Sequence, residues 1–222
     1  MAETLFSSGP VLVVGLGRFG SAVATTLASM GVEVLAVDAD AQRVQRHARE
    51  LAHVVQADAS DSDALRQLGA HEFATAIVAI GADIEASVLI TAELVDFGVQ
   101  RVWAKAISDQ HRRILLRVGA HRVFSPEREM GERVAHMVSG TVLEYLALDD
   151  GFILAETIAP ASMVGTALGD IGLRARHRIT VVCSKHEGQG FTYAEASTVV
   201  QAGDLWVVAG TDHDVGRFVT LG

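Results

Sequence analysis

The sequence predicts a doubly wound α/β fold, with helices on both faces of a parallel sheet, followed by a small α+β lobe. In the first ~125 residues, short β-branched apolar runs alternate with segments of helical periodicity, and a glycine-rich loop follows the first run. Such nearly continuous apolar strands, separated by helices, are typical of a parallel sheet covered on both faces. From about residue 148 the pattern changes to strand-like runs separated by turn signals.

The first lobe is expected to contain six strands and five helices. The strand-like runs are residues 11–15, 32–38, 53–58, 74–81, 101–106 and 121–125. The helical segments between them are residues 18–30, 40–51, 61–68, 84–97 and 108–118. Four of these helices are followed by a glycine that suits the left-handed C-terminal cap, namely Gly31, Gly69, Gly98 and Gly119.

A long helix over residues 126–146 is expected to join the two lobes. Ser125 can cap it, Pro126 suits its first position, and Glu127 favours the positive end of the helix dipole. An apolar stripe with helical spacing runs along it through Met130, Val134, Met137, Val138 and Val142. Such a stripe must cover the helix's own sheet or another chain. The predicted domains are therefore residues 1–125, the joining helix 126–146, and residues 147–222.

In the last segment, strands are expected within 151–159, 177–186 and 204–210, and helical pieces near 165–175 and 211–219. Cys183 lies in one of these strands and is interpreted as a core residue, because a nucleophilic thiolate needs an exposed, electropositive setting.

Composition excludes several classes of protein. The net charge of -9 argues against nucleic acid as a partner, because a phosphate-binding surface requires a basic balance. A single cysteine suits a reducing cytoplasm. The start of the chain lacks the basic region of a secretory signal, and no apolar run has the length of a membrane span. We expect a cytoplasmic protein that works at a membrane only through a partner.

Gly15, Gly17 and Gly20 form a G-x-G-x-x-G loop between the first strand and the first helix. These glycines allow a tight turn, close approach of backbone to phosphate, and close packing of helix on strand. Asp38 ends the second strand, where an acid accepts hydrogen bonds from ribose hydroxyls. With Asp40 nearby it would repel a 2′-phosphate, so NADP is disfavoured. The combination predicts a nucleotide site of Rossmann-like type.

Three further side chains have two readings each. Arg18, inside the glycine loop, can reach a terminal phosphate or be a surface arginine at a helix start. Asp58 can face the adenine edge or only cap a helix. Lys105, within an apolar run, can face the ligand edge of the sheet or pair with a core acid.

The histidines form no metal or catalytic motif, and His136 on a helical apolar face is interpreted as structural. A sensor therefore fits better than an enzyme. The alternative is a small NAD-dependent oxidoreductase, which needs a proton donor that the motifs do not supply. A redox-sensing repressor would need a basic recognition helix, which the sequence lacks.

The segments "VVGLGRFGSAVATTLASMGVEVLAVD", "IVAIGADIEASVL", "VWAKA" and "RVGAHRVFSPEREMGERVA" closely resemble the Ktr-type cytosolic regulatory subunits of bacterial potassium-uptake systems. These proteins contain RCK domains, regulators of potassium conductance. The resemblance is specific to about residue 140 and more general in the last lobe, so the two lobes correspond to an RCK N-lobe and C-lobe.

The resemblance implies an octameric homo-oligomeric ring, built from dimers, beneath a membrane potassium-translocating subunit. It implies ATP and ADP as ligands, NAD or NADH in some members, and cyclic di-AMP at the C-lobe of some relatives. Arg18 then contacts the γ-phosphate across the dimer. Glu127 helps to hold a cation, which can be magnesium, calcium or a monovalent ion. The implied nucleotide site comprises Gly15, Leu16, Gly17, Arg18, Phe19, Gly20, Asp38, Ala39, Asp58, Ala59, Ile80, Gly81, Ala82, Lys105 and Glu127.

Overall fold

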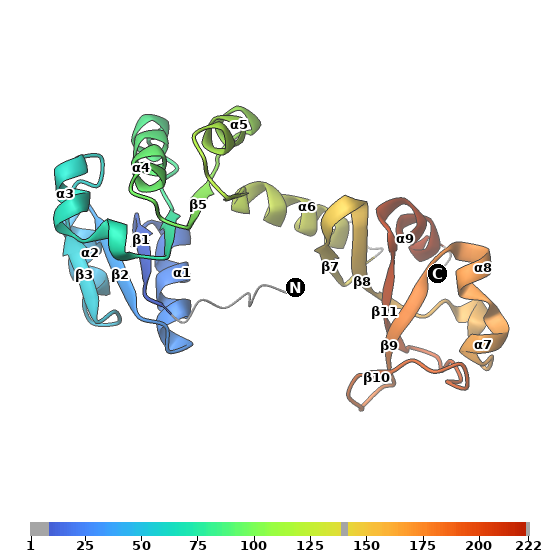
Figure 1. Ribbon diagram of the computed structural model, residues 1–222. Helices are drawn as coiled ribbons and strands as arrows, with labels where there is room; N and C mark the ends of the chain where they lie inside the picture. Colours follow the sequence, from blue (N-terminus) through green and yellow to red (C-terminus); the bar gives the residue numbers. More distant parts are fainter. Residues whose placement is uncertain (1–8, 139–141, 221–222) are drawn as a thin grey trace. The chain divides into compact units, whose positions relative to one another are not determined.

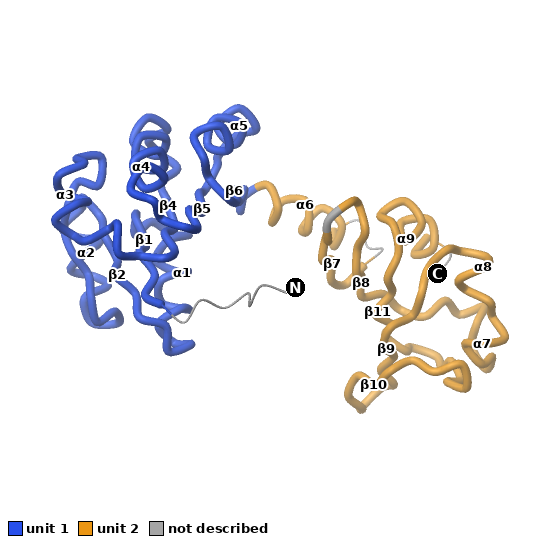
Figure 2. The backbone as a smooth tube through the Cα atoms, viewed as in Figure 1, with its two compact units in different colours: residues 1–127 blue, residues 128–222 orange. Residues whose placement is uncertain are grey.

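The computed structural model describes residues 9–138 and 142–220 (Figure 1). The chain divides into two compact units, residues 1–127 and residues 128–222, coloured blue and orange in Figure 2. Unit 1 contains a six-stranded parallel sheet, and unit 2 contains a five-stranded antiparallel sheet. The prediction of a doubly wound sheet followed by a smaller α+β lobe is confirmed.

The parallel sheet has the strand order β3-β2-β1-β4-β5-β6. Its strands are β1 (Val11–Val14), β2 (Val34–Asp38), β3 (His53–Gln56), β4 (Thr75–Val78), β5 (Arg101–Lys105) and β6 (Arg122–Phe124). Every position of β1 and β4 is buried, because these strands lie at the centre and are covered on both faces. The order reverses between β1 and β4, and ligands of doubly wound folds bind at this switch point, outside the carboxyl ends of the strands.

Helices cover both faces of this sheet. They are α1 (Arg18–Ser29), α2 (Ala41–His47), α3 (Ser62–Gln67), α4 (Ile84–Asp96) and α5 (Asp109–Arg117). Leu12 and Val14 face a core with α4 and α5, whereas Val11 and Val13 face a second core with α1. The predicted glycine caps are confirmed, since φ is positive at Gly31, Gly69, Gly98 and Gly119.

The long joining helix was predicted incorrectly at its end. Helix α6 spans Pro126–Val138, and residues 139–141 of the expected helix lie outside the described residues. Glu144–Ala147 form strand β7, which pairs antiparallel with β8 (Phe152–Ile158). Asp150 and Gly151 both have positive φ. The sequence "DDG" therefore favours a hairpin turn here, and the chain forms this turn instead of continuing the helix. Val142 is buried in the core of unit 2 rather than lying on a helical stripe.

Unit 2 has the strand order β10-β9-β11-β8-β7. Its remaining elements are α7 (Leu168–Ile171), α8 (Leu173–His177), β9 (Thr180–Lys185), β10 (Thr192–Tyr193), β11 (Leu205–Thr211) and α9 (Asp212–Val219). Trp206 and Phe218 stack inside its core, with ring centroids 6.3 Å apart. Cys183 lies in β9 as expected and is half-buried. No helix among the described residues is long and apolar enough to cross a membrane.

His111 is an ionisable side chain inside unit 1. It lies in the first turn of α5, is 1% exposed, and neither ring nitrogen has a hydrogen-bond partner. Burial lowers the pKa of its imidazole below the ordinary value, because the charged form loses its hydration.

Acid should therefore destabilise the fold through His111. The unfolded chain takes up this proton near pH ~6.5, whereas the folded chain resists it to lower pH, so the free energy of unfolding falls as pH drops between the two values. In the variant His111→Leu, urea denaturation should show a weaker loss of stability between about pH 7 and pH 5. His71→Leu, at an exposed histidine, serves as the control. Parallel pH profiles for His111→Leu and wild type would contradict the assignment.

Candidate functional site

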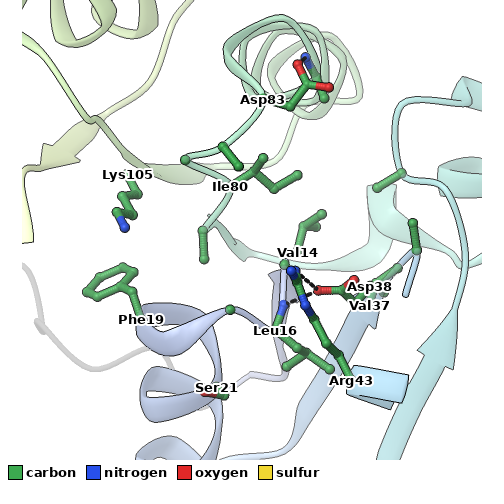
Figure 3. Close-up of a pocket in the computed structure, with 18 of the residues that line it drawn as sticks. Val14, Leu16, Phe19, Ser21, Val37, Asp38, Arg43, Ile80, Asp83 and Lys105 are labelled. Carbon is green, nitrogen blue, oxygen red and sulfur yellow. Dashed lines mark hydrogen bonds and ion pairs between the residues drawn. The ribbon is translucent and has the colours of Figure 1, made fainter. Parts of the chain in front are cut away.

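A cavity of about 930 Å³ lies at the switch point of the parallel sheet, and all of its lining residues belong to unit 1 (Figure 3). It is formed where the carboxyl ends of β1, β2, β4 and β5 meet the start of α1. Its volume is in the range of small-molecule and cofactor sites. The cavity contains every predicted site residue except Gly20.

The glycine loop shows why each glycine is needed. Gly15 has φ +98°, a conformation that residues with a Cβ rarely adopt. A Cβ on Gly20 would lie 1.8 Å from the carbonyl oxygen of Gly15, so Gly20 packs beneath the loop rather than lining the cavity. A Cβ on Gly17 would meet no atom within 4 Å. Since Gly17 is also the N-cap of α1, without a side-chain cap, the loop leaves open space beside the first helical amides, as phosphate binding requires.

Asp38 connects the glycine loop to β2. Its side chain is 7% exposed, and its Oδ2 accepts a hydrogen bond from the amide of Leu16 at 2.6 Å. Its Oδ1 accepts another from the amide of Asp40 at 2.8 Å. The carboxylate is therefore fixed at the cavity wall. Oδ1 retains acceptor capacity for a ribose hydroxyl, whereas Oδ2 also accepts from Arg43.

Three basic side chains of α2 line the same end of the cavity, namely Arg43, Arg46 and His47. Arg43 Nη1 lies 3.3 Å from Asp38 Oδ2 (Figure 3). Arg43 Nε lies 3.5 Å from Asp40 Oδ2. A ribose that engages Asp38 must therefore compete with Arg43. These three residues were not predicted from the sequence, although the spacing of Asp40 and Arg43 at the start of a helix is typical of an ion pair.

Lys105 and Glu127 form an ion pair at the other end of the cavity. Lys105 Nζ donates to Glu127 Oε1 at 2.6 Å, and their side chains are 12% and 58% exposed. Each of the two interpretations of Lys105 agrees in part with the structure. Lys105 lines the cavity at the carboxyl end of the sheet, and it also pairs with an acid, although that acid is exposed rather than in the core. Lys105 Nζ also lies 6.0 Å from the ring centroid of Phe19 (Figure 3).

The electrostatics of Glu127 depend on this pair. The hydrogen bond from Lys105 lowers the pKa of Glu127, partial burial opposes the change, and the charges of Lys105 and Arg18 lower it further. The cation predicted at Glu127 would thus compete with Lys105. Among the residues that the structure describes, no three His, Cys, Asp or Glu side chains gather as a metal site. A cation here would need oxygen ligands from a bound phosphate or another chain.

Asp58 lines the cavity without capping the next helix. Its Oδ1 accepts hydrogen bonds from the amide and hydroxyl of Ser60 at 2.9 and 2.6 Å, and these bonds lower the pKa of the Asp58 carboxyl. The cap of α3 is Asp61 instead. In unit 2, His136 stacks on Tyr145 with ring centroids 4.1 Å apart, which agrees with a structural role.

The switch-point cavity, the glycine loop and the acid at the end of β2 define the class of this protein, a Rossmann-type domain whose cavity has the geometry of a nucleotide site. The TrkA-N domain family matches residues 11–126. The chain is 38% identical over 207 residues to Ktr system potassium uptake protein C of Bacillus subtilis, covering 93% of this chain and 94% of the relative. It is 34% identical over 199 residues to Ktr system potassium uptake protein A of Vibrio alginolyticus, covering 89% and 90%.

The chain therefore belongs to the TrkA-N family, as a member of the group of Ktr potassium uptake proteins. Among solved structures, the GsuK RCK domain superposes with a TM-score of 0.65 at 17% identity, covering 97% of this chain and 48% of the other. This likeness confirms the RCK fold over both units.

Gly17 and Gly20 should respond differently to the same substitution. Gly20→Ala should destabilise the fold, because the new Cβ would collide with the Gly15 carbonyl. Gly17→Ala should keep the thermal midpoint, because its Cβ enters open space and φ -68° suits alanine, but it should weaken nucleotide binding. Thermal unfolding and calorimetric titration with ADP measure the two effects. If Gly17→Ala binds ADP as wild type does, no phosphate approaches the loop.

Removing the Lys105 ammonium should raise the pKa of Glu127 towards its ordinary value of about 4.3. Because the folded pKa is depressed, the pair stabilises the fold above that ordinary value, and the stabilisation is lost as pH falls through the depressed value. Carboxyl ¹³C NMR titration of Lys105→Met should show one glutamate titrating at higher pH. Lys185→Met, at the chain's other lysine, is the matched control and should leave Glu127 unchanged.

Proposed function

We propose that this chain is the nucleotide-sensing regulatory subunit of a potassium-uptake system, and that it distinguishes ATP from ADP. The observation that carries the proposal is the layout of the cavity, in which the buried Asp38 lies on one side of the glycine loop, and Arg18 and the Lys105–Glu127 ion pair lie on the other. Family membership supports the potassium-transport assignment, because the relatives are named potassium uptake proteins.

The side chains suggest how an adenine nucleotide would lie. Asp38 and the neighbouring Ala39 would receive the ribose, with Asp58 and Ala59 bordering the adenosine end. The diphosphate would pass over Gly17 to the first amides of α1, where the helix dipole favours negative charge. A further phosphate would then be directed towards Arg18, Lys105 and Glu127.

This arrangement can distinguish two nucleotides that share an adenosine diphosphate. Lys105 is committed to Glu127, so a γ-phosphate would take over the ammonium and leave the Glu127 carboxylate available to a cation such as Mg²⁺ or Ca²⁺. ADP, which lacks that phosphate, would leave the pair intact. A ligand shifts a conformational equilibrium only by its differential affinity for the two states, and these contacts would supply the difference.

The output is proposed to pass through an assembly of identical chains. Met130, Val134, Met137 and Val138 of α6 are exposed apolar side chains in this single chain. Their burial in a dimer, and of dimers in an octameric ring, would remove this surface from water. The ring would act on a membrane potassium-translocating subunit, so the chain would be cytoplasmic and peripheral to the membrane. NAD or NADH is a second candidate ligand, since the GsuK channel, which shares the fold, is known bound to NAD.

Arg18→Glu should weaken ATP binding about tenfold or more while changing ADP affinity much less, because only the terminal phosphate meets the reversed charge. Calorimetric titration with ATP and with ADP, each at the same magnesium concentration, gives the two ratios. Arg113→Glu is the matched control, a charge reversal on an exposed residue of α5 outside the cavity.

An equal loss for both nucleotides would refute the γ-phosphate role of Arg18. Light scattering on the same wild-type samples should give a mass near eight chains. A strictly monomeric protein that binds neither ATP nor ADP would overturn the proposed function, and sustained NADH oxidation would favour the oxidoreductase alternative.

A further inference from the structure

Unit 1 has a second hollow, at the amino ends of the strands, whereas the proposed nucleotide cavity lies at their carboxyl ends. It has a volume of about 540 Å³ and lies at the amino ends of β1 and β2 and along β3. Seven of its ten lining residues are apolar, and the other three are the ionisable residues Glu33, His53 and Glu72. The lining comprises Pro10, Glu33, Leu35, Ala52, His53, Val54, Val55, Leu68, Glu72 and Phe73.

One wall of this hollow is an edge strand. Strand β3 ends the sheet order, and within the described residues its backbone pairs only with β2 (Figure 1). An open edge presents free amide and carbonyl groups that an extended segment can pair with, and side-chain pockets beside it then give specificity. Val55 of β3 lies in register with Val37 and so shares its face with Leu35, where Leu68 and Phe73 also pack.

The rim of the hollow is acidic. The side chains of Glu33 and Glu72 are 70% and 77% exposed. Among the described residues, the basic side chains within 4 Å are histidines, with His53 3.9 Å from Glu33 and His71 3.8 Å from Glu72. Carboxylates at an exposed rim favour a cationic partner through complementary potentials and faster encounter. The net charge of -9 for the whole chain acts in the same direction.

Charge argues against two other occupants of the hollow, a second copy of this chain and the chain's own residues 1–8. A second copy that paired its β3 edge antiparallel about a two-fold axis would present His53–Gln56, which include no lysine or arginine to meet the carboxylates of Glu33 and Glu72. The chain's own residues 1–8, which precede Pro10, contain Glu3 and neither lysine nor arginine. The remaining occupant is a basic, partly apolar segment of another protein.

We propose that this hollow, with the β3 edge, docks an extended Lys/Arg-bearing segment from a cytosolic loop of the membrane potassium-translocating subunit. Short cytoplasmic loops of membrane proteins carry an excess of lysine and arginine, which matches the acidic rim. The inference rests on the proposed function, because that function supplies the membrane partner. It places docking at the amino ends of the strands and nucleotide sensing at their carboxyl ends.

The test measures binding of the full chain to the purified translocating subunit in lipid nanodiscs. Glu33→Lys combined with Glu72→Lys should weaken binding about tenfold, mainly through slower association, and should flatten its salt dependence. Glu187→Lys combined with Glu195→Lys makes the same change of charge at exposed acids of unit 2 and should bind as wild type does. Both double variants should titrate normally with ADP, because the substituted residues lie outside the nucleotide cavity.

Hydrogen exchange supplies the second readout. Amide exchange over His53–Gln56 should slow when the translocating subunit is bound, and unchanged exchange would overturn pairing at the β3 edge. Wild-type affinity in the Glu33→Lys, Glu72→Lys variant would overturn the docking site and leave the proposed function standing. No binding by the wild-type chain, with or without nucleotide, would overturn both.

Discussion

The hydrogen bond from the Leu16 amide to Asp38 is the interaction on which the switch-point cavity depends. A carboxylate that is almost fully buried is costly unless its oxygens are satisfied, and here two backbone amides and one arginine satisfy it. The same bond ties the loop between β1 and α1 to the end of β2. It thereby orients the first amides of α1 towards the space above Gly17. Loss of Asp38 would therefore change the position of the loop.

Local sequence signals were sufficient to predict those parts of the cavity whose residues lie close together in the chain. The G-x-G-x-x-G loop and the glycine helix caps need specific backbone conformations, and few residue types other than glycine provide them. The parallel sheet covered on both faces follows from the alternating strand and helix patterns, whereas the order of its strands was not predicted. Asp38 was recognisable because its distance from the loop is typical of ribose-binding acids.

The remainder could not be read from the sequence because it depends on contacts between distant segments. Lys105 and Glu127 are separated by 22 positions, and only the ends of β5 and β6 bring them together. Arg43 belongs to a short helix with no buried residue, so no periodic pattern marked the face it presents. The β7–β8 hairpin was missed because pairing with β8 outweighed a helical pattern that carries little free energy of its own.

Glu127 has a mechanical consequence as well as an electrostatic one. It is the final residue of unit 1 and lies in the first turn of α6. From Arg128 onward, the residues of this helix belong to unit 2. The group that binds the Glu127 carboxylate, an ammonium group or a cation, therefore also holds the first turn of α6. An exchange of partners at Glu127 Oε1 would therefore change the contact that ties the first turn of α6 to the end of β5.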